Sequence, residues 1–208
     1  MNINYQGGNI YNKYASKNPL IRILMNKYFE DLNTLITPIK EEIDSAIEIG
    51  CGEGYITQYI KDMGINIEGA DIYEQIINVA SNLHPSIEFH VRSIYELTRY
   101  DNTYDLVLAT EVLEHLNHPE RAVQEMAKVS NKYVFISVPN DALLRLANIT
   151  RLKYLEDLGN TPGHINHWSK NSFREFLEHQ GLNEVQLKCS TLWMMALCDI
   201  RSRHELNF

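Results

Sequence analysis

Glycines alternate with other residues at positions 50, 52 and 54, directly after a short apolar run that includes the acidic residue Glu48. Glycine has no Cβ and tolerates positive φ, so this pattern permits a tight turn from strand to helix with a ligand close to the backbone. Two common nucleotide motifs do not fit. A dinucleotide fingerprint starting at Gly50 would need glycine or alanine where Tyr55 stands, and a phosphate-binding loop would need a lysine that this stretch lacks. The loop is predicted to bind another kind of ligand.

A second acidic residue, Asp71, follows the next apolar run and comes 21 residues after Gly50. In dinucleotide-binding folds a carboxylate at this place, about 20 residues beyond the glycine loop, accepts hydrogen bonds from ribose hydroxyls. Asp71 could instead cap the helix expected to start near Tyr73. Because it follows the glycine loop at this spacing, the ligand role is favoured.

Three histidines are candidate general bases, since imidazole titrates near neutral pH. His115 follows a predicted strand, at the edge of an open sheet where ligands bind. His164 and His167 lie just before a helix that Ser169 is expected to cap. Each also has a structural interpretation: His115 could pack at a helix start, and His167 could dock the last helix together with Trp168.

The elements that must position these residues alternate along the chain. Apolar runs that read as strands are separated by amphipathic stretches, and Asn18-Pro19 and Pro119 mark helix starts. This alternation predicts an α/β fold with a mostly parallel sheet and helices on both faces. The last two runs have no helix between them, which predicts an antiparallel pair at one edge. The seven expected strands are 46–49, 66–70, 87–91, 104–109, 133–138, 185–188 and 191–197.

Size and charge limit the possible functions. At 208 residues the chain is expected to form one domain, and its net charge of -8 makes nucleic-acid binding unlikely. Its three cysteines show no metal-type spacing and suit reduced thiols. No run approaches the ~20 apolar residues of a membrane span. A cytoplasmic protein without a membrane span, monomeric or homodimeric, with a small-molecule substrate is expected.

Five segments, taken in order, resemble the motifs of the class I S-adenosylmethionine-dependent methyltransferases. Glu48 and the three glycines match the first motif, and Asp71 stands at the second strand end. The other segments are 89–97, 104–116 and 132–140. The resemblance implies a Rossmann-like, doubly wound, seven-stranded sheet with an antiparallel last strand, and S-adenosylmethionine as cofactor. The cofactor contacts it implies are Tyr14, Glu48, Gly50, Cys51, Gly52, Gly54, Asp71, Ile72, Ser93, Ile94, Thr110 and Glu111.

The same resemblance divides the single domain into parts. Residues 1–40 are expected to form a helical lid, in which Tyr11, Lys13 or Tyr14 touches the methionine end of the cofactor. The cofactor-binding core is expected at 44–140, a substrate-side insert with a helical stretch at 141–168, and the last helix with the C-terminal strands at 169–208. One departure stands out: Ser93 replaces the usual aspartate of the adenine-binding segment, and a neutral acceptor forms a weaker hydrogen bond.

The expected reaction is methyl transfer to a small molecule, with a hydroxyl acceptor slightly preferred to an amine. Two alternatives remain open. Glu111, Glu114, His115 and either His164 or His167 resemble the ligand set of metal-dependent RNA 3′-terminal 2′-O-methyltransferases, although the same Glu-Val-Leu-Glu-His run occurs in metal-free relatives, and no metal is the favoured expectation. The other is a binding module that holds S-adenosylmethionine without catalysis, which the change at Ser93 keeps open.

Overall fold

A computed structural model of the chain describes residues 14, 16–100, 103–141, 143, 161, 163–182, 184–189 and 192–202. Its strands are β1 (Ala46–Ile49), β2 (Ile67–Asp71), β3 (Phe89–Val91), β4 (Tyr104–Thr110), β5 (Ser130–Pro139), β6 (Glu184–Cys189) and β7 (Trp193–Asp199). They form one seven-stranded sheet in the order β3-β2-β1-β4-β5-β7-β6. The first five strands pair in parallel, and β7 is antiparallel to both β5 and β6. The sheet order reverses between β1 and β4, as in doubly wound folds.

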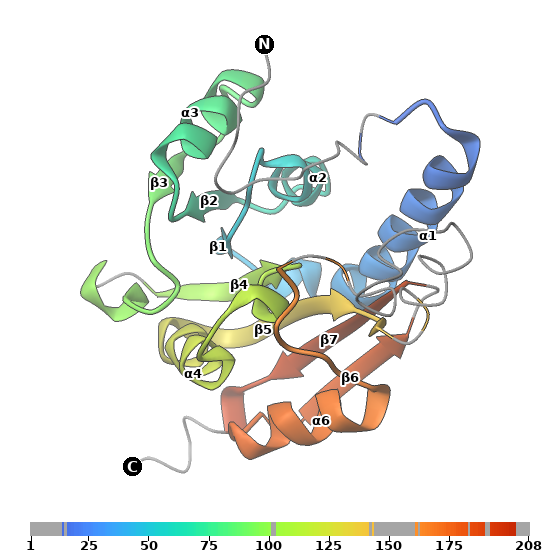
Figure 1. Cartoon of the computed structure of the whole chain (residues 1–208). Coiled ribbons are helices and arrows are strands. Elements are labelled where there is room, and N and C mark those ends of the chain that lie inside the picture. The colour runs from blue at the N-terminus through green and yellow to red at the C-terminus, as the bar shows by residue number, and fades with distance from the viewer. Residues whose placement is uncertain are drawn as a thin grey trace.

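Helices cover both faces of this sheet (Figure 1). The α-helices are α1 (Pro19–Ile36), α2 (Tyr55–Asp62), α3 (Glu74–Leu83), α4 (Pro119–Val129) and α6 (Lys170–His179). Short 3₁₀ turns are η1 (Thr37–Glu42), η2 (Leu97–Tyr100) and η3 (Leu113–His115). α4 and α6 share one buried apolar cluster with the sheet, and α1 and α2 share another on the opposite face. These features confirm the predicted fold class.

The central strand β4 shows how the core is divided. All of its residues are buried, as expected for a parallel strand with helices on both sides. Leu106 and Leu108 pack into the cluster with α1 and α2, whereas Val107 and Ala109 pack into the cluster with α4 and α6. Alternate side chains of β4 therefore pack into the two apolar clusters, and this packing fixes the position of Thr110 and the residues after it at the end of the strand.

Helix α1 is anchored to the sheet by buried polar contacts as well as apolar ones. Asn18 caps its first turn by accepting a hydrogen bond from the Leu20 amide at 2.9 Å, as the Asn18-Pro19 pair predicts. Further along, the Tyr28 hydroxyl lies 3.1 Å from Ser137 Oγ, and Lys188 Nζ lies 3.2 Å from the buried Asp31 Oδ1. Residues 1–13 lie outside the described part, so Tyr11 and Lys13 do too, and a lid role for residues 1–40 stays a proposal.

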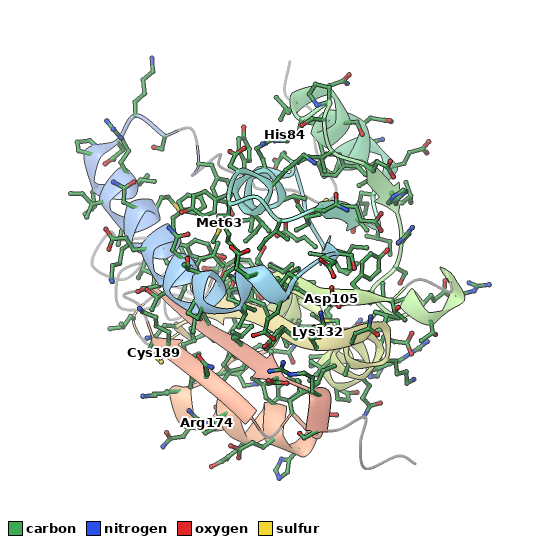
Figure 2. The ribbon with its side chains drawn as sticks, turned by 180° about the vertical axis from the view of Figure 1, so that it is seen from behind. Met63, His84, Asp105, Lys132, Arg174 and Cys189 are labelled. Atoms are coloured by element: carbon green, nitrogen blue, oxygen red, sulfur yellow. The ribbon has the colours of Figure 1, made fainter. Side chains whose placement is uncertain are left out.

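At the amino ends of β4 and β5 the charged groups hold the fold together. Lys132 Nζ lies 3.2 Å from Asp105 Oδ1, and the two side chains are labelled next to each other in Figure 2. The second oxygen of Asp105 accepts a hydrogen bond from the Asp44 amide at 2.9 Å. These contacts join the segment before β1 to the starts of two strands, so this edge of the sheet is a structural one.

The expected strands all exist, with shifted ends. β5 begins at Ser130 instead of residue 133, because the chain passes from α4 into the strand without a loop. β3 is shorter than expected: Glu88 lies before the strand, although its carbonyl still accepts a hydrogen bond from Gly69. Residues 142 and 144–160, where a helical stretch was expected, lie outside the described part.

Among the described residues, no helix is both long and apolar enough to cross a membrane. A cytoplasmic location stays a prediction.

Candidate active site

A cavity of about 650 Å³ opens at the carboxyl edge of the sheet. Its walls come from the turns that follow β1, β2 and β4, from residues 92–95, and from Tyr14, Thr161 and His164. Because the carboxyl ends of parallel strands meet at one edge, residues that are far apart in sequence share this space. Nearly all of the predicted cofactor contacts line it: Tyr14, Glu48, Gly50, Cys51, Gly52, Asp71, Ile72, Ser93, Ile94, Thr110 and Glu111.

The glycine loop forms the floor of the cavity. Gly50 and Gly52 have φ values of 74° and 55°, in the left-handed region that disfavours other residues. A Cβ at Gly50 would overlap Cγ2 of Val112, whereas a Cβ at Gly52 would meet no atom within 4 Å. The first glycine is therefore required by packing, and the second leaves open space directly above the backbone. This space fits a ligand that lies against the main chain. Gly54 also has positive φ, but it is not among the described lining residues.

Asp71 connects the glycine loop to the end of β2. Its Oδ2 accepts a hydrogen bond from the Gly52 amide at 3.1 Å, and its Oδ1 accepts one from the Tyr73 amide at 3.1 Å. Burial raises the pKa of this carboxyl group, while the hydrogen bonds from Tyr73 and Gly52 lower it. Asp71 is thus placed beside the open space over Gly52. It also holds the turn before α3, although the N-cap itself is Tyr73.

Glu48 is buried under the loop with both carboxylate oxygens hydrogen bonded. Thr57 Oγ1 donates to one oxygen at 2.6 Å and Thr110 Oγ1 donates to the other. The side chain therefore joins β1, α2 and the end of β4. Burial raises its pKa to about 7, against the opposing effect of these hydrogen bonds. Glu48 shapes the cavity wall, and direct contact with a ligand stays a proposal.

Residues 92–95 form the far wall, where the adenine segment is expected. Ser93 Oγ accepts a hydrogen bond from the Tyr95 amide at 3.3 Å, which is a local turn contact. Arg92 Nη1 donates to Glu68 Oε1 at 3.1 Å and to the Tyr104 hydroxyl at 2.9 Å. The guanidinium is thereby held on the β2 side, and the apolar Ile94 is buried beside it.

Glu111 begins the turn after β4 in a strained conformation. Among the described residues, Glu111 is the non-glycine residue that has a positive φ, with a value of 59°. Its amide donates a hydrogen bond to the Ser137 carbonyl at 3.0 Å. Such a conformation costs about 1–2 kcal/mol and is concentrated at functional sites.

Tyr14 stacks on Tyr55 with ring centroids 5.0 Å apart. Burial, followed by the carboxylates of Glu111 and Glu48, raises the pKa of Tyr14, so its phenol stays protonated.

His115 has a defined tautomer. Its Nδ1 lies 2.9 Å from the Gly163 carbonyl oxygen, which can only accept a hydrogen bond. Nδ1 therefore carries the proton and Nε2 carries the lone pair. Burial lowers the pKa of His115, the Gly163 carbonyl opposes this, and His164 lowers it further. The ring is neutral at neutral pH and can accept a proton on Nε2.

The other two histidines are placed differently. The His164 ring packs edge to face on His115 with centroids 5.0 Å apart, and it lines the cavity. His167 is not among the described lining residues; its Nδ1 lies 3.3 Å from Asp141 Oδ1 instead. Two of the three predicted histidines thus meet at the cavity. His167 belongs to the support of the segment, because Asp141 also accepts a hydrogen bond from the neighbouring Trp168 amide at 3.1 Å.

Residues 20–187 match a family model described as a methyltransferase domain. The chain belongs to this family. Together with the seven-stranded sheet, the match confirms the class I S-adenosylmethionine-dependent methyltransferase family predicted from the motifs.

Curated relatives of this methyltransferase are distant. A ubiquinone biosynthesis O-methyltransferase of Coxiella burnetii is 24% identical over 186 residues, which cover 81% of this chain and 77% of the relative. A protein of the same name from Cupriavidus pinatubonensis is 33% identical over 103 residues, covering 45% and 41% of the two chains.

Solved structures share the fold. Magnesium protoporphyrin IX methyltransferase from Synechocystis PCC 6803 with bound SAH has a TM-score of 0.65 at 14% identity, with 89% of both chains covered. The plantazolicin methyltransferase BpumL, in complex with a triazolic desmethylPZN analog and SAH, has a TM-score of 0.67 at 16% identity, with 88% of this chain and 86% of that chain covered.

The methyltransferase also has cavity residues that sequence reasoning missed. Arg92, Tyr95, Val112, Leu116 and Thr161 line the space, and Glu53 and Tyr55 do so next to the glycines. Most of them lie inside the motif segments 89–97 and 104–116 or in the glycine loop, where no role was predicted for them. Thr161 follows no predicted strand and lies in no motif. Asp141 is buried and comes directly after the motif segment that ends at residue 140, so no motif marked it.

A possible metal-ligand group lies on the acceptor side of the methyltransferase. Glu114, His115 and His164 each offer a ligand atom, and these atoms lie within 4.8 Å of one another. The set proposed from the sequence is brought together only in part, because Glu111 and His167 are not members of this described group.

Proposed function

We propose that this methyltransferase moves the methyl group of S-adenosylmethionine to a hydroxyl oxygen of a small molecule. When bound, the cofactor supplies a methyl group activated by the neighbouring sulfonium. One observation carries the choice of a hydroxyl acceptor: the Gly163 carbonyl holds His115 as a neutral base whose lone pair is on Nε2, in a cavity at the carboxyl edge. The names of the curated relatives, which are O-methyltransferases, support the same choice.

Different lining residues suit the two parts of the cofactor. Gly52 and Asp71 offer open backbone and a carboxylate that suit the adenosine part of the cofactor, and Ser93 with Ile94 would face its base. Glu111 and the protonated phenol of Tyr14 line the same cavity and would face the positively charged methionine part. An acidic lining stabilises that positive charge. Glu48 supports this lining from below.

His115 would act on the acceptor. Nε2 takes the hydroxyl proton while the oxygen forms its bond to the methyl carbon and the electrons of the carbon–sulfur bond stay on sulfur. The imidazolium that results lies near the carboxylate of Glu111, whose charge raises the pKa of His115. Orientation supplies most of the acceleration in such a displacement, so a single base and a fixed cofactor are sufficient.

The test uses matched acceptors and a matched histidine. Small phenols, and anilines with the same ring, are offered together with S-adenosylmethionine, and release of S-adenosylhomocysteine is measured across pH. We expect turnover with the phenols, and a kcat that rises with pH through an apparent pKa below the ordinary 6.5 of histidine. His115→Gln should lower kcat by about 10²-fold or more and leave cofactor affinity unchanged.

His179→Gln, at the exposed end of α6, is the control and should behave as the parent protein. A His115→Gln variant with a kcat within about threefold of the parent would refute the base role. Turnover of anilines but not phenols would refute the hydroxyl acceptor. Binding of S-adenosylmethionine without turnover of any acceptor would favour the non-catalytic module.

A second candidate is a metal-dependent enzyme acting on the 2′-hydroxyl of an RNA 3′ end. The closeness of Glu114, His115 and His164 favours it, because imidazole and carboxylate are ligands for divalent metals. Histidines that bind metals usually hold their other ring nitrogen against an oxygen acceptor, as Nδ1 of His115 does with Gly163. Activity on RNA that is abolished by EDTA and restored by one divalent metal would support this candidate. Unchanged activity in EDTA would exclude it.

A further inference from the structure

The segment Gly163–Trp168 is fastened to the turn η3 by a dense set of backbone contacts. The amides of Ile165 and Asn166 both donate to the Glu114 carbonyl, at 2.9 and 3.1 Å. The side-chain amide of Asn166 donates to the Leu113 carbonyl at 2.9 Å and to the Leu116 carbonyl at 2.6 Å. Asn166 therefore bridges the beginning of η3 and the residue that follows it.

This bridge requires an asparagine. A turn of three residues has few hydrogen bonds of its own: the Leu113 carbonyl accepts one from the Leu116 amide at 3.2 Å. Asn166 Nδ2 has two hydrogens in one plane, so a single atom can satisfy two carbonyls at once. An aspartate of the same shape has no hydrogen to donate when ionised and would place negative charge against both oxygens.

The same segment supplies the carbonyl that sets the His115 tautomer. Gly163 has a φ of 88°, and its oxygen accepts from His115 Nδ1 at 2.9 Å. His115 belongs to η3, and Asn166 holds η3 and the segment together. Two backbone amides and the Asn166 side chain therefore join the elements that carry His115 and Gly163, and this side chain touches neither of those residues in the described contacts.

We infer that Asn166 is a positioning residue for His115, because it locks η3 and the Gly163–Trp168 segment in the arrangement where Nδ1 is protonated and Nε2 is the base. The inference rests on the proposed function for its effect on catalysis, but its effect on the tautomer does not depend on that function. The ionisable groups that face His115 are Glu111, Glu114 and His164.

The experiment compares Asn166→Asp with Asn78→Asp, which adds the same charge at an exposed position of α3. The full chain is labelled with ¹⁵N, and the ring nitrogen signals of His115 are assigned by their loss in His115→Gln. In the parent protein we expect the Nδ1–H tautomer. Asn166→Asp should shift His115 toward the Nε2–H form, lower kcat at least tenfold, and change the affinity for S-adenosylmethionine less than twofold. Asn78→Asp should change none of these.

Two further comparisons separate the possible outcomes. Asn166→Ser, which keeps one donor, is measured in the same way in case the aspartate variant does not fold, and an intermediate shift in tautomer is expected. An unchanged tautomer in folded Asn166→Asp or Asn166→Ser would overturn the inference. A shifted tautomer together with full activity of His115→Gln would leave the positioning role in place and reject His115 as the base.

Discussion

Glu48 shows how one residue can link the cavity to the stability of the fold. Its carboxyl group is buried, with two threonine hydroxyls as partners, and burial raises its pKa to about 7. In the unfolded chain the group returns to its ordinary pKa of 4.5. The folded state therefore retains the proton over a range of pH in which the unfolded state has lost it. The contribution of this group to the free energy of unfolding is therefore fully present below pH 4.5 and is lost as pH rises through about 7.

This linkage predicts the behaviour of Glu48→Gln, which keeps the shape and cannot ionise. Relative to the parent protein, the variant should gain about 2–3 kcal/mol in the free energy of unfolding between pH 5 and pH 8. Urea denaturation at the two pH values measures the difference. Asp62→Asn, on the exposed side of α2, should show no such gain. A constant difference between Glu48→Gln and the parent at both pH values would show that Glu48 is already ionised in the fold.

The kind of contact that a site residue makes determines whether it could be predicted from the sequence. The glycines and Asp71 act through the backbone directly after a strand, so their type and spacing expose them. Asn166 acts on Leu113, 53 positions away, and the partners of Asp141 lie more than 20 residues along the chain. Nothing local marks such a side chain. His167 was chosen for its type and its place just before the helix capped by Ser169, and in the fold its Nδ1 lies 3.3 Å from Asp141 Oδ1.

At the scale of elements, two glycines of the same loop have different surroundings: Gly50 packs against Val112, and Gly52 faces open space in the cavity. We expect Gly52→Ala to weaken S-adenosylmethionine binding at least tenfold, since the new methyl group would occupy the open space over the loop. The free energy of unfolding should fall only by the cost of a left-handed alanine, about 1 kcal/mol, with a correspondingly small drop in the thermal midpoint. Calorimetric titration and thermal unfolding measure the two effects.

Gly50→Ala is the matched variant, with the same change and nearly the same φ. Its methyl group would collide with the partly buried Val112, so it should destabilise the fold by about 1–3 kcal/mol more than Gly52→Ala does. Equal losses of stability in the two variants would mean that the floor of the cavity is packed as tightly as the core beside it.

Elements were easier to predict than their ends and their anchors. The strands and α1 followed from apolar spacing and from Asn18-Pro19, because those signals are local. The early start of β5 at Ser130 was missed, since it depends on the pairing of Ser130 with Tyr104 of β4. The buried Asp31 of α1 would be assigned to the surface by its type. Its Oδ1 is paired with Lys27 of the same helix at 3.0 Å and with Lys188 of β6 at 3.2 Å, and the second pair depends on the fold.

At the scale of the whole molecule, the cavity collects residues from Tyr14 to His164, so a bound ligand touches most of the chain's length. A ligand that binds only the folded state at 100 times its Kd adds about 2.7 kcal/mol to stability. For a chain of this size, S-adenosylmethionine at that concentration should raise the thermal midpoint by about 5–10 °C. Differential scanning fluorimetry measures it. ATP, which lacks the methionine part, should give a smaller shift, and the lack of any shift with S-adenosylmethionine would refute the cofactor assignment.

The left-handed Glu111 has a consequence for any attempt to make this protein more heat resistant. Glycine or asparagine at that position would release the backbone strain, so a screen that rewards survival at high temperature would favour replacing the carboxylate. The more thermostable variants would lose a charged group from the rim of the cavity. Position 111 is therefore where directed evolution for heat resistance and directed evolution for turnover should first select different residues.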